Sequence, residues 1–283
     1  MENEKKVTWK KVLLGSVLAI ACLVISQLLA QTCGELLTLF DLSENIAVVI
    51  SSVLYPLLTF LSLKFVFNKL MKLPLNKLRI NKFKINISGI LIGVLLPAFV
   101  VTTYLFIQGE WMETDASKAE KITLVVWGIC FYSVAGGIVE EMVFRGVIMG
   151  LLEKWKNIRI AVLAPSVLFG LIHVLNGALS PVSLIQLVVA GTVVGILFSL
   201  IAVYYDSIWN NALVHALWNA STIGIMHIDT QMDNNSVYTY VLRSRSNLIT
   251  GGDFGIEASL ISIIAYCLFI GIMILLLKKK KEN

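Results

Sequence analysis

The chain has 283 residues, of which 57% are hydrophobic and only 14% are charged. This composition excludes an ordinary soluble domain and predicts an integral membrane protein. The formal net charge of +5 comes mainly from basic residues at the chain ends and beside apolar runs, so it indicates membrane orientation and excludes a nucleic-acid partner.

Apolar runs of about 20 residues, long enough for a helix to cross a bilayer, recur along the whole chain. None alternates with a period of two, and a helix satisfies its own backbone hydrogen bonds in lipid. We therefore predict an all-α fold, a polytopic membrane helix bundle in which residues 1–283 form a single integral membrane domain. About eight transmembrane helices are expected, over residues 12–30, 46–66, 87–107, 122–152, 158–176, 182–203, 208–228 and 256–277.

Basic and acidic residues occupy different connecting segments. Lysine and arginine gather at both chain ends and in the loops 64–84 and 153–159, whereas the loops 31–45 and 108–121 are acidic. All the basic segments fall on one side of the membrane if the chain has eight spans. The positive-inside rule then predicts cytoplasmic termini, in a cell membrane of bacterial type.

The stretch GGIVEEMVFRG, residues 136–146, places Glu140, Glu141 and Arg145 inside an apolar span. Ionisable residues at membrane depth indicate a functional site in the bundle interior. Glu141 and Arg145 are four residues apart with the acid first, a spacing that favours an ion pair on one helix face. Glu140 is rotated away and has no partner in its own helix, so it is the candidate general base.

Two histidines of the following spans can meet this carboxylate. His173 ends the stretch FGLIH, and His215 begins the stretch HALWN, which ends at Asn219. Asn211, His215 and Asn219 are spaced by four and form a polar stripe on one helix face. Helical rise places Glu140, His173, His215 and Asn219 at overlapping depths of about 11 to 20 Å from the cytoplasmic ends of their spans.

Two other patterns favour structural roles. Gly191, Gly195 and Ser199 are spaced by four, which predicts a close approach between helix backbones. His227, at the outer end of the predicted span 208–228, is expected to be a satisfied interfacial histidine.

Three motifs carry a resemblance to a known family. EEMVFR fits the pattern EExxxR, FGLIH fits FxxxH, and HALWN fits HxxxN, in this order on successive helices. Over residues 122–222, the predicted catalytic core, the chain resembles the CPBP family of CAAX proteases and bacteriocin-processing or immunity proteins, also called the Abi family. The resemblance implies an intramembrane protease with its site inside the helix bundle.

The resemblance also implies roles for these residues. Glu140 with His173 would activate water for attack on a peptide carbonyl, and His215 with Asn219 would stabilise the oxyanion. Glu141 and Arg145 would hold the local structure.

The cofactor is left open. The family is often labelled metalloprotease, and Glu140, His173 and His215 could form a three-ligand zinc site. The sequence has no HExxH motif, and if Glu140 were a ligand, Glu141 would have to act as the base while paired with Arg145. We therefore favour a metal-independent glutamate–histidine mechanism.

The expected partners are the lipid bilayer and a peptide or membrane-protein substrate, small and membrane-associated or lipidated. Its cleavage would serve processing of a bacteriocin or pheromone, or self-immunity. Serine and aspartyl mechanisms are disfavoured, because no GxSxG motif is present, Asp206 lies at a span end and Asp253 lies in a loop. The alternatives are a non-enzymatic membrane immunity or scaffold protein and a proton-coupled transporter, since buried Glu and His also serve proton relays.

Overall fold

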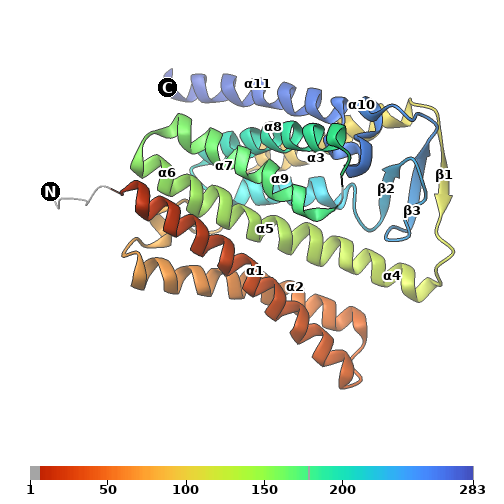
Figure 1. The fold of residues 1–283 in the computed structure, drawn as a ribbon, viewed down its shortest axis with the longest axis horizontal. Helices are drawn as coiled ribbons and strands as arrows, with labels where there is room; N and C mark the ends of the chain where they lie inside the picture. The colour runs from red at the N-terminus through yellow and green to blue at the C-terminus, as the bar shows by residue number, and fades with distance from the viewer. Residues whose placement is uncertain (1–6, 178, 283) are drawn as a thin grey trace.

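Long apolar helices run side by side through most of the computed structural model, which describes residues 7–177 and 179–282 (Figure 1). This arrangement confirms the predicted all-α polytopic bundle. Within the described residues, six helices are long and apolar enough to cross a membrane. They are α1 (Trp9–Leu39), α2 (Glu44–Phe65) with its π-helical continuation Val66–Leu70, α3 (Ile87–Leu105), the helix Lys118–Trp155, α8 (Pro181–Tyr205) and α11 (Leu260–Glu282).

Two predicted spans are shorter than expected, so the count of eight is not confirmed. α7 (Ile158–His173) has 16 residues and α9 (Trp209–Ala220) has 12. At 1.5 Å per residue these helices are about 24 and 18 Å long, less than the roughly 30 Å of a hydrocarbon core. The predicted span 208–228 stops being an α-helix after Ala220, and its last residues enter a strand.

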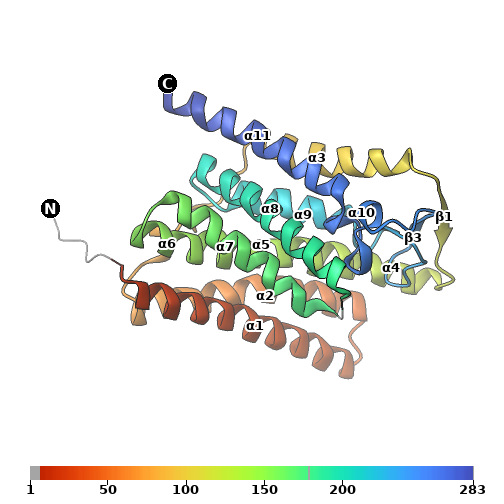
Figure 2. The same ribbon diagram turned by 45° about the horizontal axis from the view of Figure 1, so that its top comes forward.

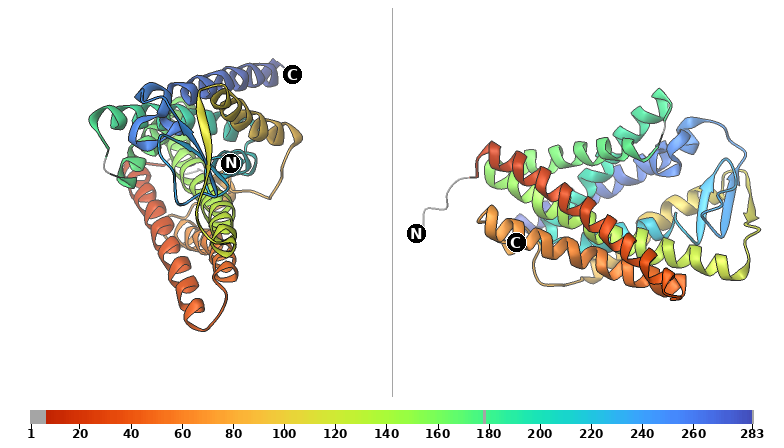
Figure 3. Two further views of the ribbon diagram at one scale, coloured as in Figure 1. Left: turned by 90° about the vertical axis from the view of Figure 1, so that its right-hand side faces the viewer. Right: turned by 60° about the horizontal axis from the view of Figure 1, so that its bottom comes forward.

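A small sheet caps one end of the bundle (Figures 1 and 3). Its strands are β1 (Gly109–Glu113), β2 (Met226–Asp229) and β3 (Tyr238–Leu242), in the order β1-β3-β2. β3 is antiparallel to β1 and parallel to β2. The remaining short elements are α10 (Asn247–Thr250) and the 3₁₀ turns Leu75–Lys77, Val174–Asn176, Gly252–Phe254 and Ile256–Ala258.

The helix Lys118–Trp155 is irregular around the acidic motif. A capping box between Ser117 and Glu120 starts it, with the Ser117 side chain accepting from the Glu120 amide and the Glu120 carboxylate from the Ser117 amide. Its parts are α4 (Lys118–Val126), a π-helical stretch Trp127–Ala135, α5 (Gly136–Glu141), a second π-helical stretch Met142–Ile148 and α6 (Met149–Trp155). The two adjacent glutamates therefore end a short α-helix between two π-helical stretches, a geometry that is frequent at functional sites.

Close packing of α7 against α8 follows the predicted small-residue pattern. A Cβ atom added to Gly191 would lie 2.6 Å from the Cα of Gly170, and one added to Gly195 would lie 2.8 Å from the Cα of Ser166. The hydroxyl oxygens of Ser166 and Ser199 are 3.4 Å apart. The backbones can approach this closely because no larger side chain separates them.

The start of α1 and the end of α11 lie at the end of the bundle opposite the sheet (Figures 1 and 2). The basic segments come together there. Arg79 forms ion pairs with Glu153, at 2.6 Å, and with Asp206, at 3.2 Å. Lys280 donates to the Tyr204 carbonyl at 2.6 Å, which fixes the end of α11 beside the end of α8.

Candidate active site

A cavity of about 350 Å³ lies among α5, α7, α8 and α9, towards the sheet end of the bundle. All four residues expected to be catalytic contribute to its walls: Glu140, His173, His215 and Asn219. Leu187, Gly191 and Val194 of α8 add an apolar side, and the segment 254–257 closes the cavity near the sheet. The tertiary structure therefore brings the three sequence motifs to one enclosed space.

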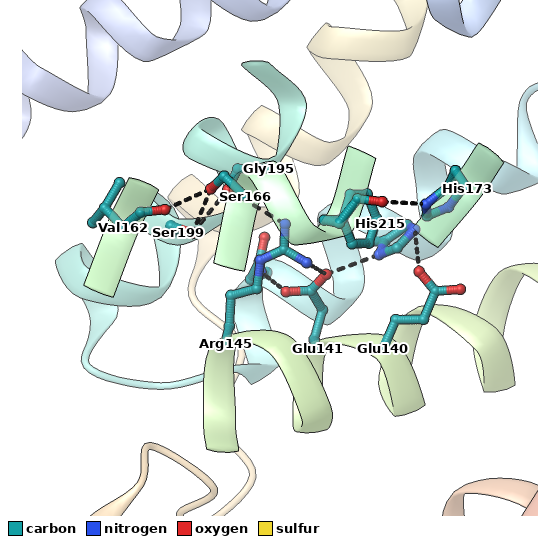
Figure 4. Close-up of polar contacts among 11 residues, drawn as sticks. Glu140, Glu141, Arg145, Val162, Ser166, His173, Gly195, Ser199 and His215 are labelled. Atoms are coloured by element: carbon teal, nitrogen blue, oxygen red, sulfur yellow. Dashed lines mark hydrogen bonds and ion pairs between the residues drawn. The ribbon is translucent and has the colours of Figure 1, made fainter. Parts of the chain in front are cut away.

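Arg145 and Glu141 form a fully buried ion pair (Figure 4). Nη1 of Arg145 lies 3.0 Å from Oε1 of Glu141, as the spacing of four residues predicts. Nη2 of Arg145 donates to the Gly195 carbonyl of α8 at 3.3 Å. Its guanidinium carbon is 4.5 Å from the ring centroid of Phe169 in α7. Arg145 thus joins the acidic motif to two neighbouring helices.

Glu141 also binds the polar stripe of α9. Nδ1 of His215 lies 2.9 Å from Oε1 of Glu141, and the side-chain amide of Asn211 donates to Oε2. An ionised carboxylate can only accept, so the proton in the first contact belongs to Nδ1 of His215. This bond leaves Nε2 of His215 on the side of Glu140 (Figure 4). Glu141 therefore orients the imidazole, as hydrogen-bonded carboxylates do for functional histidines.

Glu140 stands apart from this network. Its side chain is 28% exposed, and its Oε2 lies 3.9 Å from Nε2 of His215, a separation longer than a hydrogen bond. That oxygen is buried and accepts no hydrogen bond from any described residue. No described hydrogen bond or ion pair joins Glu140 to His173, although both line the cavity. The Glu140 carboxylate thus keeps one oxygen without a described hydrogen-bond donor.

His173 and Asn219 are each fixed by a backbone carbonyl. Nδ1 of His173 lies 2.7 Å from the Phe169 carbonyl oxygen, which can only accept, so the Nδ1 proton makes this bond. Nε2 of a neutral His173 is then free to accept a proton. The side-chain amide of Asn219 donates to the Tyr132 carbonyl at 3.3 Å, from the first π-helical stretch of the helix Lys118–Trp155.

The sheet end of the cavity holds polar residues that the sequence motifs did not include. Thr222 donates to Glu257 at 2.9 Å, and the Tyr266 hydroxyl donates to the Glu257 carbonyl at 3.3 Å. These residues line the cavity although Glu257 belongs to a predicted span without a polar pattern. No sequence signal identified them, because only the fold of the segment before α11 brings Glu257 here.

His227 lies in β2 and also lines the sheet end of the cavity. It has partners, as expected of a satisfied histidine: Nδ1 donates to the Thr222 carbonyl at 2.8 Å, and Nε2 is 3.7 Å from Asp229. Burial alone would lower the pKa of His227, but the Asp229 carboxylate, the Thr222 carbonyl and nearby Asp233 outweigh it and raise the pKa to about 9.

The residues named as possible zinc ligands do not fit a three-ligand site in this arrangement. Among the described residues, no group of three His, Cys, Asp or Glu side chains is placed to hold a metal ion. Nδ1 of each histidine is bonded to a protein group, which leaves Nε2 of His173 and of His215 without a described hydrogen bond, and no described contact connects Glu140 to His173.

Comparison with known proteins identifies the same region. Residues 122–221, which run from within α4 to the end of α9, match the family model described as type II CAAX prenyl endopeptidase Rce1-like. This match confirms the resemblance found in the sequence motifs. No curated protein and no solved structure matches the chain.

Proposed function

We propose that the protein is an intramembrane endopeptidase that uses Glu140 to activate water. The observation that carries this proposal is the convergence of Glu140, His173, His215 and Asn219 on the walls of one cavity inside the bundle. A cavity of about 350 Å³ has room for water and for part of an extended peptide. The family match to residues 122–221 supports a protease independently of this geometry.

The reaction would begin with a water molecule held between Glu140 and Nε2 of His173. Glu140, with His173 beside the water, takes a proton from it, and the water oxygen forms a bond to the peptide carbonyl carbon. The proton is then delivered to the peptide nitrogen as the carbon–nitrogen bond breaks. The products are a carboxylic acid and an amine, which ionise to carboxylate and ammonium, and Glu140 and His173 return to their starting states.

His215 and Asn219 would stabilise the negative charge that develops on the carbonyl oxygen. Glu141 holds Nδ1 of His215, so a protonated His215 presents its Nε2–H to the cavity. Asn219 has a second amide proton besides the one bonded to the Tyr132 carbonyl. Donors held in place before the reaction stabilise an oxyanion more than mobile water can. Glu141 acts through His215 and is a positioning residue.

The proposed substrate is a small membrane-associated or lipidated protein or peptide. The matching family model is named for CAAX prenyl endopeptidases, and a prenyl group is a lipid. The apolar side of the cavity formed by α8 supports a substrate that approaches from the bilayer. Processing of a secreted peptide and self-immunity are the two cellular roles that such a cleavage would serve.

We also propose that both termini face the cytoplasm. The basic segments meet at the end of the bundle opposite the sheet, where the positive-inside rule places the cytoplasm. The catalytic cavity would then lie nearer the outer face. Asn235→Cys in the exposed loop before β3 should react with an impermeant maleimide in intact cells, and Lys281→Cys only after lysis, in a chain whose native cysteines are replaced. The reverse pattern would invert the proposed topology.

The proposed activity is tested by mass spectrometry of membrane peptides from cells that produce the chain or its Glu140→Gln variant. A specific cleavage product should be present with the wild type and absent with Glu140→Gln. Glu257→Gln is the matched control, because Glu257 is a second carboxylate on the same cavity with no part in the proposed chemistry. Peptide patterns that do not differ between the wild type and Glu140→Gln would favour a non-enzymatic scaffold.

A further inference from the structure

A second pocket lies at the end of the bundle opposite the sheet, and the charged residues of its described lining are lysines. They come from three segments: Lys11 from α1, Lys72 and Lys77 from the connection between α2 and α3, and Lys154 from α6. The pocket has a volume of about 640 Å³, and its described lining contains no acidic side chain. Ammonium groups gathered around one hollow repel each other, and a bound anion relieves that repulsion.

Three of these lysines, Lys11, Lys72 and Lys154, have no acidic partner among the described residues. Glu153 is adjacent in sequence to Lys154, but its carboxylate is 2.6 Å from Arg79 and lies in a neighbouring hollow with Asp206. The two pockets at this end therefore differ: the described lining of one carries both signs of charge, and the charged side chains in the described lining of the other are lysines.

Lys72 also has an unusual backbone conformation. Its φ is 53°, in the left-handed region that glycine adopts easily and that costs other residues about 1–2 kcal/mol. Strained positions of this kind cluster at ligand sites. Here the strained position is occupied by a lysine on the pocket wall, where a glycine would fit the backbone better.

The remaining lining favours a lipid over a free ion. Apolar side chains of Leu70, Met71 and Leu151 line the pocket together with the lysines. Leu70 is 62% exposed. On α1, Leu13 and Leu14, which follow Lys11 in the sequence, are 60% and 53% exposed. A phosphate group beside acyl chains would satisfy both surfaces at once, whereas inorganic phosphate would leave the apolar part uncovered.

We propose that this pocket binds the phosphate-bearing headgroup of an anionic phospholipid, with its acyl chains against the exposed face of α1. Clustered lysines at the membrane surface contribute about 1 kcal/mol each to the binding of anionic lipid. The proposal is independent of the catalytic cavity, which lies towards the other end of the bundle and shares no residue with this pocket.

The test uses the purified full chain in neutral detergent and native mass spectrometry to count bound lipids. Phosphatidylglycerol should bind the wild type in preference to phosphatidylcholine, and raising the salt concentration should weaken it. The combined variant Lys11→Gln, Lys72→Gln and Lys154→Gln should lose about 10- to 100-fold in affinity for phosphatidylglycerol. Inorganic phosphate is titrated separately, and we expect it to bind much more weakly.

The matched control is the combined variant Lys82→Gln, Lys84→Gln and Lys156→Gln. It removes the same charge from exposed positions at the same end of the bundle, outside the pocket. This control should bind phosphatidylglycerol like the wild type. Equal losses in the two combined variants would show a diffuse charge effect and overturn the proposal.

Lys72→Gly separates the charge from the backbone strain. Glycine suits a φ of 53°, so this variant should unfold at a higher temperature than the wild type while it binds phosphatidylglycerol more weakly. Unchanged binding by Lys72→Gly would contradict the role of this lysine. Binding of inorganic phosphate as tight as that of phosphatidylglycerol, or a wild type that does not prefer phosphatidylglycerol to phosphatidylcholine, would overturn the lipid assignment.

Discussion

Nδ1 of His215 lies 2.9 Å from Oε1 of Glu141, the same oxygen that the guanidinium of Arg145 binds at 3.0 Å. One carboxylate thus connects an internal ion pair to an imidazole on the wall of the cavity. The adjacent Glu140 lies outside this network, with an oxygen that accepts no hydrogen bond from a described residue. The two neighbouring glutamates therefore have different surroundings. Glu141 holds the site together, and Glu140 is available for chemistry.

This difference predicts opposite effects on stability. Glu141→Gln leaves the fully buried Arg145 without its counter-ion, which should lower the free energy of unfolding by about 3–5 kcal/mol. Glu140→Gln should leave the unfolding midpoint near that of the wild type, because its carboxylate makes no described hydrogen bond through Oε2. Thermal unfolding of both variants in detergent measures the contrast. Similar midpoints for the two variants would argue against separate roles.

His173 should matter for catalysis and little for stability. His173→Gln removes the free Nε2 and should lower kcat by about 10²- to 10⁴-fold, the range for loss of a general acid–base group. His227→Gln is the matched control, since His227 also lines the cavity but takes no part in the proposed chemistry. Turnover of the substrate identified by mass spectrometry is the measurement. A kcat that His173→Gln leaves at the wild-type level would remove His173 from the mechanism.

The contact between α7 and α8 should tolerate no added methyl group. A Cβ atom on Gly170 would lie 2.8 Å from the Val188 carbonyl oxygen, so Gly170→Ala should destabilise the bundle by about 1–3 kcal/mol. Gly271→Ala is the control, because a Cβ atom there has no neighbour within 4 Å. That variant should be neutral or slightly stabilised, since alanine favours a helix more than glycine does. Unfolding in detergent measures both, and equal effects would contradict the close approach.

The sheet end of the cavity should lose stability in alkali. The pKa of His227 is raised from 6.5 to about 9 in the folded protein, so the folded state holds this proton more tightly than the unfolded state. The resulting stabilisation is fully present below pH 6.5 and is lost as the pH rises through about 9. The pKa of Asp229 is lowered despite its burial, chiefly by its contact with His227, so the stabilisation that Asp229 contributes is lost on acidification below the ordinary value of 3.8.

Hydrogen exchange of β2 and β3 measures this pH dependence. Protection, corrected for the intrinsic exchange rate, should fall between pH 6.5 and 9 in the wild type. The His227→Gln variant should show little change over the same range, because glutamine does not titrate. A wild-type profile as flat as that of the variant would indicate that the His227–Asp229 contact does not stabilise the sheet.

Local sequence patterns were sufficient for the fold class and for one contact of the site. Continuous apolar runs predict helices because a membrane segment must satisfy its own backbone groups. The spacing of four residues predicts the Glu141–Arg145 pair because it fixes both side chains on one face of a helix. Both inferences depend on interactions between residues that are close together in the sequence, and the order of amino acids determines these interactions directly.

Contacts between distant segments required the tertiary structure. The binding of Asn211 and His215 to Glu141 depends on how α9 is rotated relative to the helix Lys118–Trp155. The π-helical stretches of that helix change the direction in which its side chains point, compared with a regular α-helix. The placement of Glu257 in the cavity and the pairing of β1 with β3 depend on chain connections without a local pattern. The amino-acid order alone therefore determined a membrane bundle with an internal ion pair, and only the packing of its helices decided that Asn211 and His215 bind Glu141, because those contacts depend on the rotation of one helix relative to another.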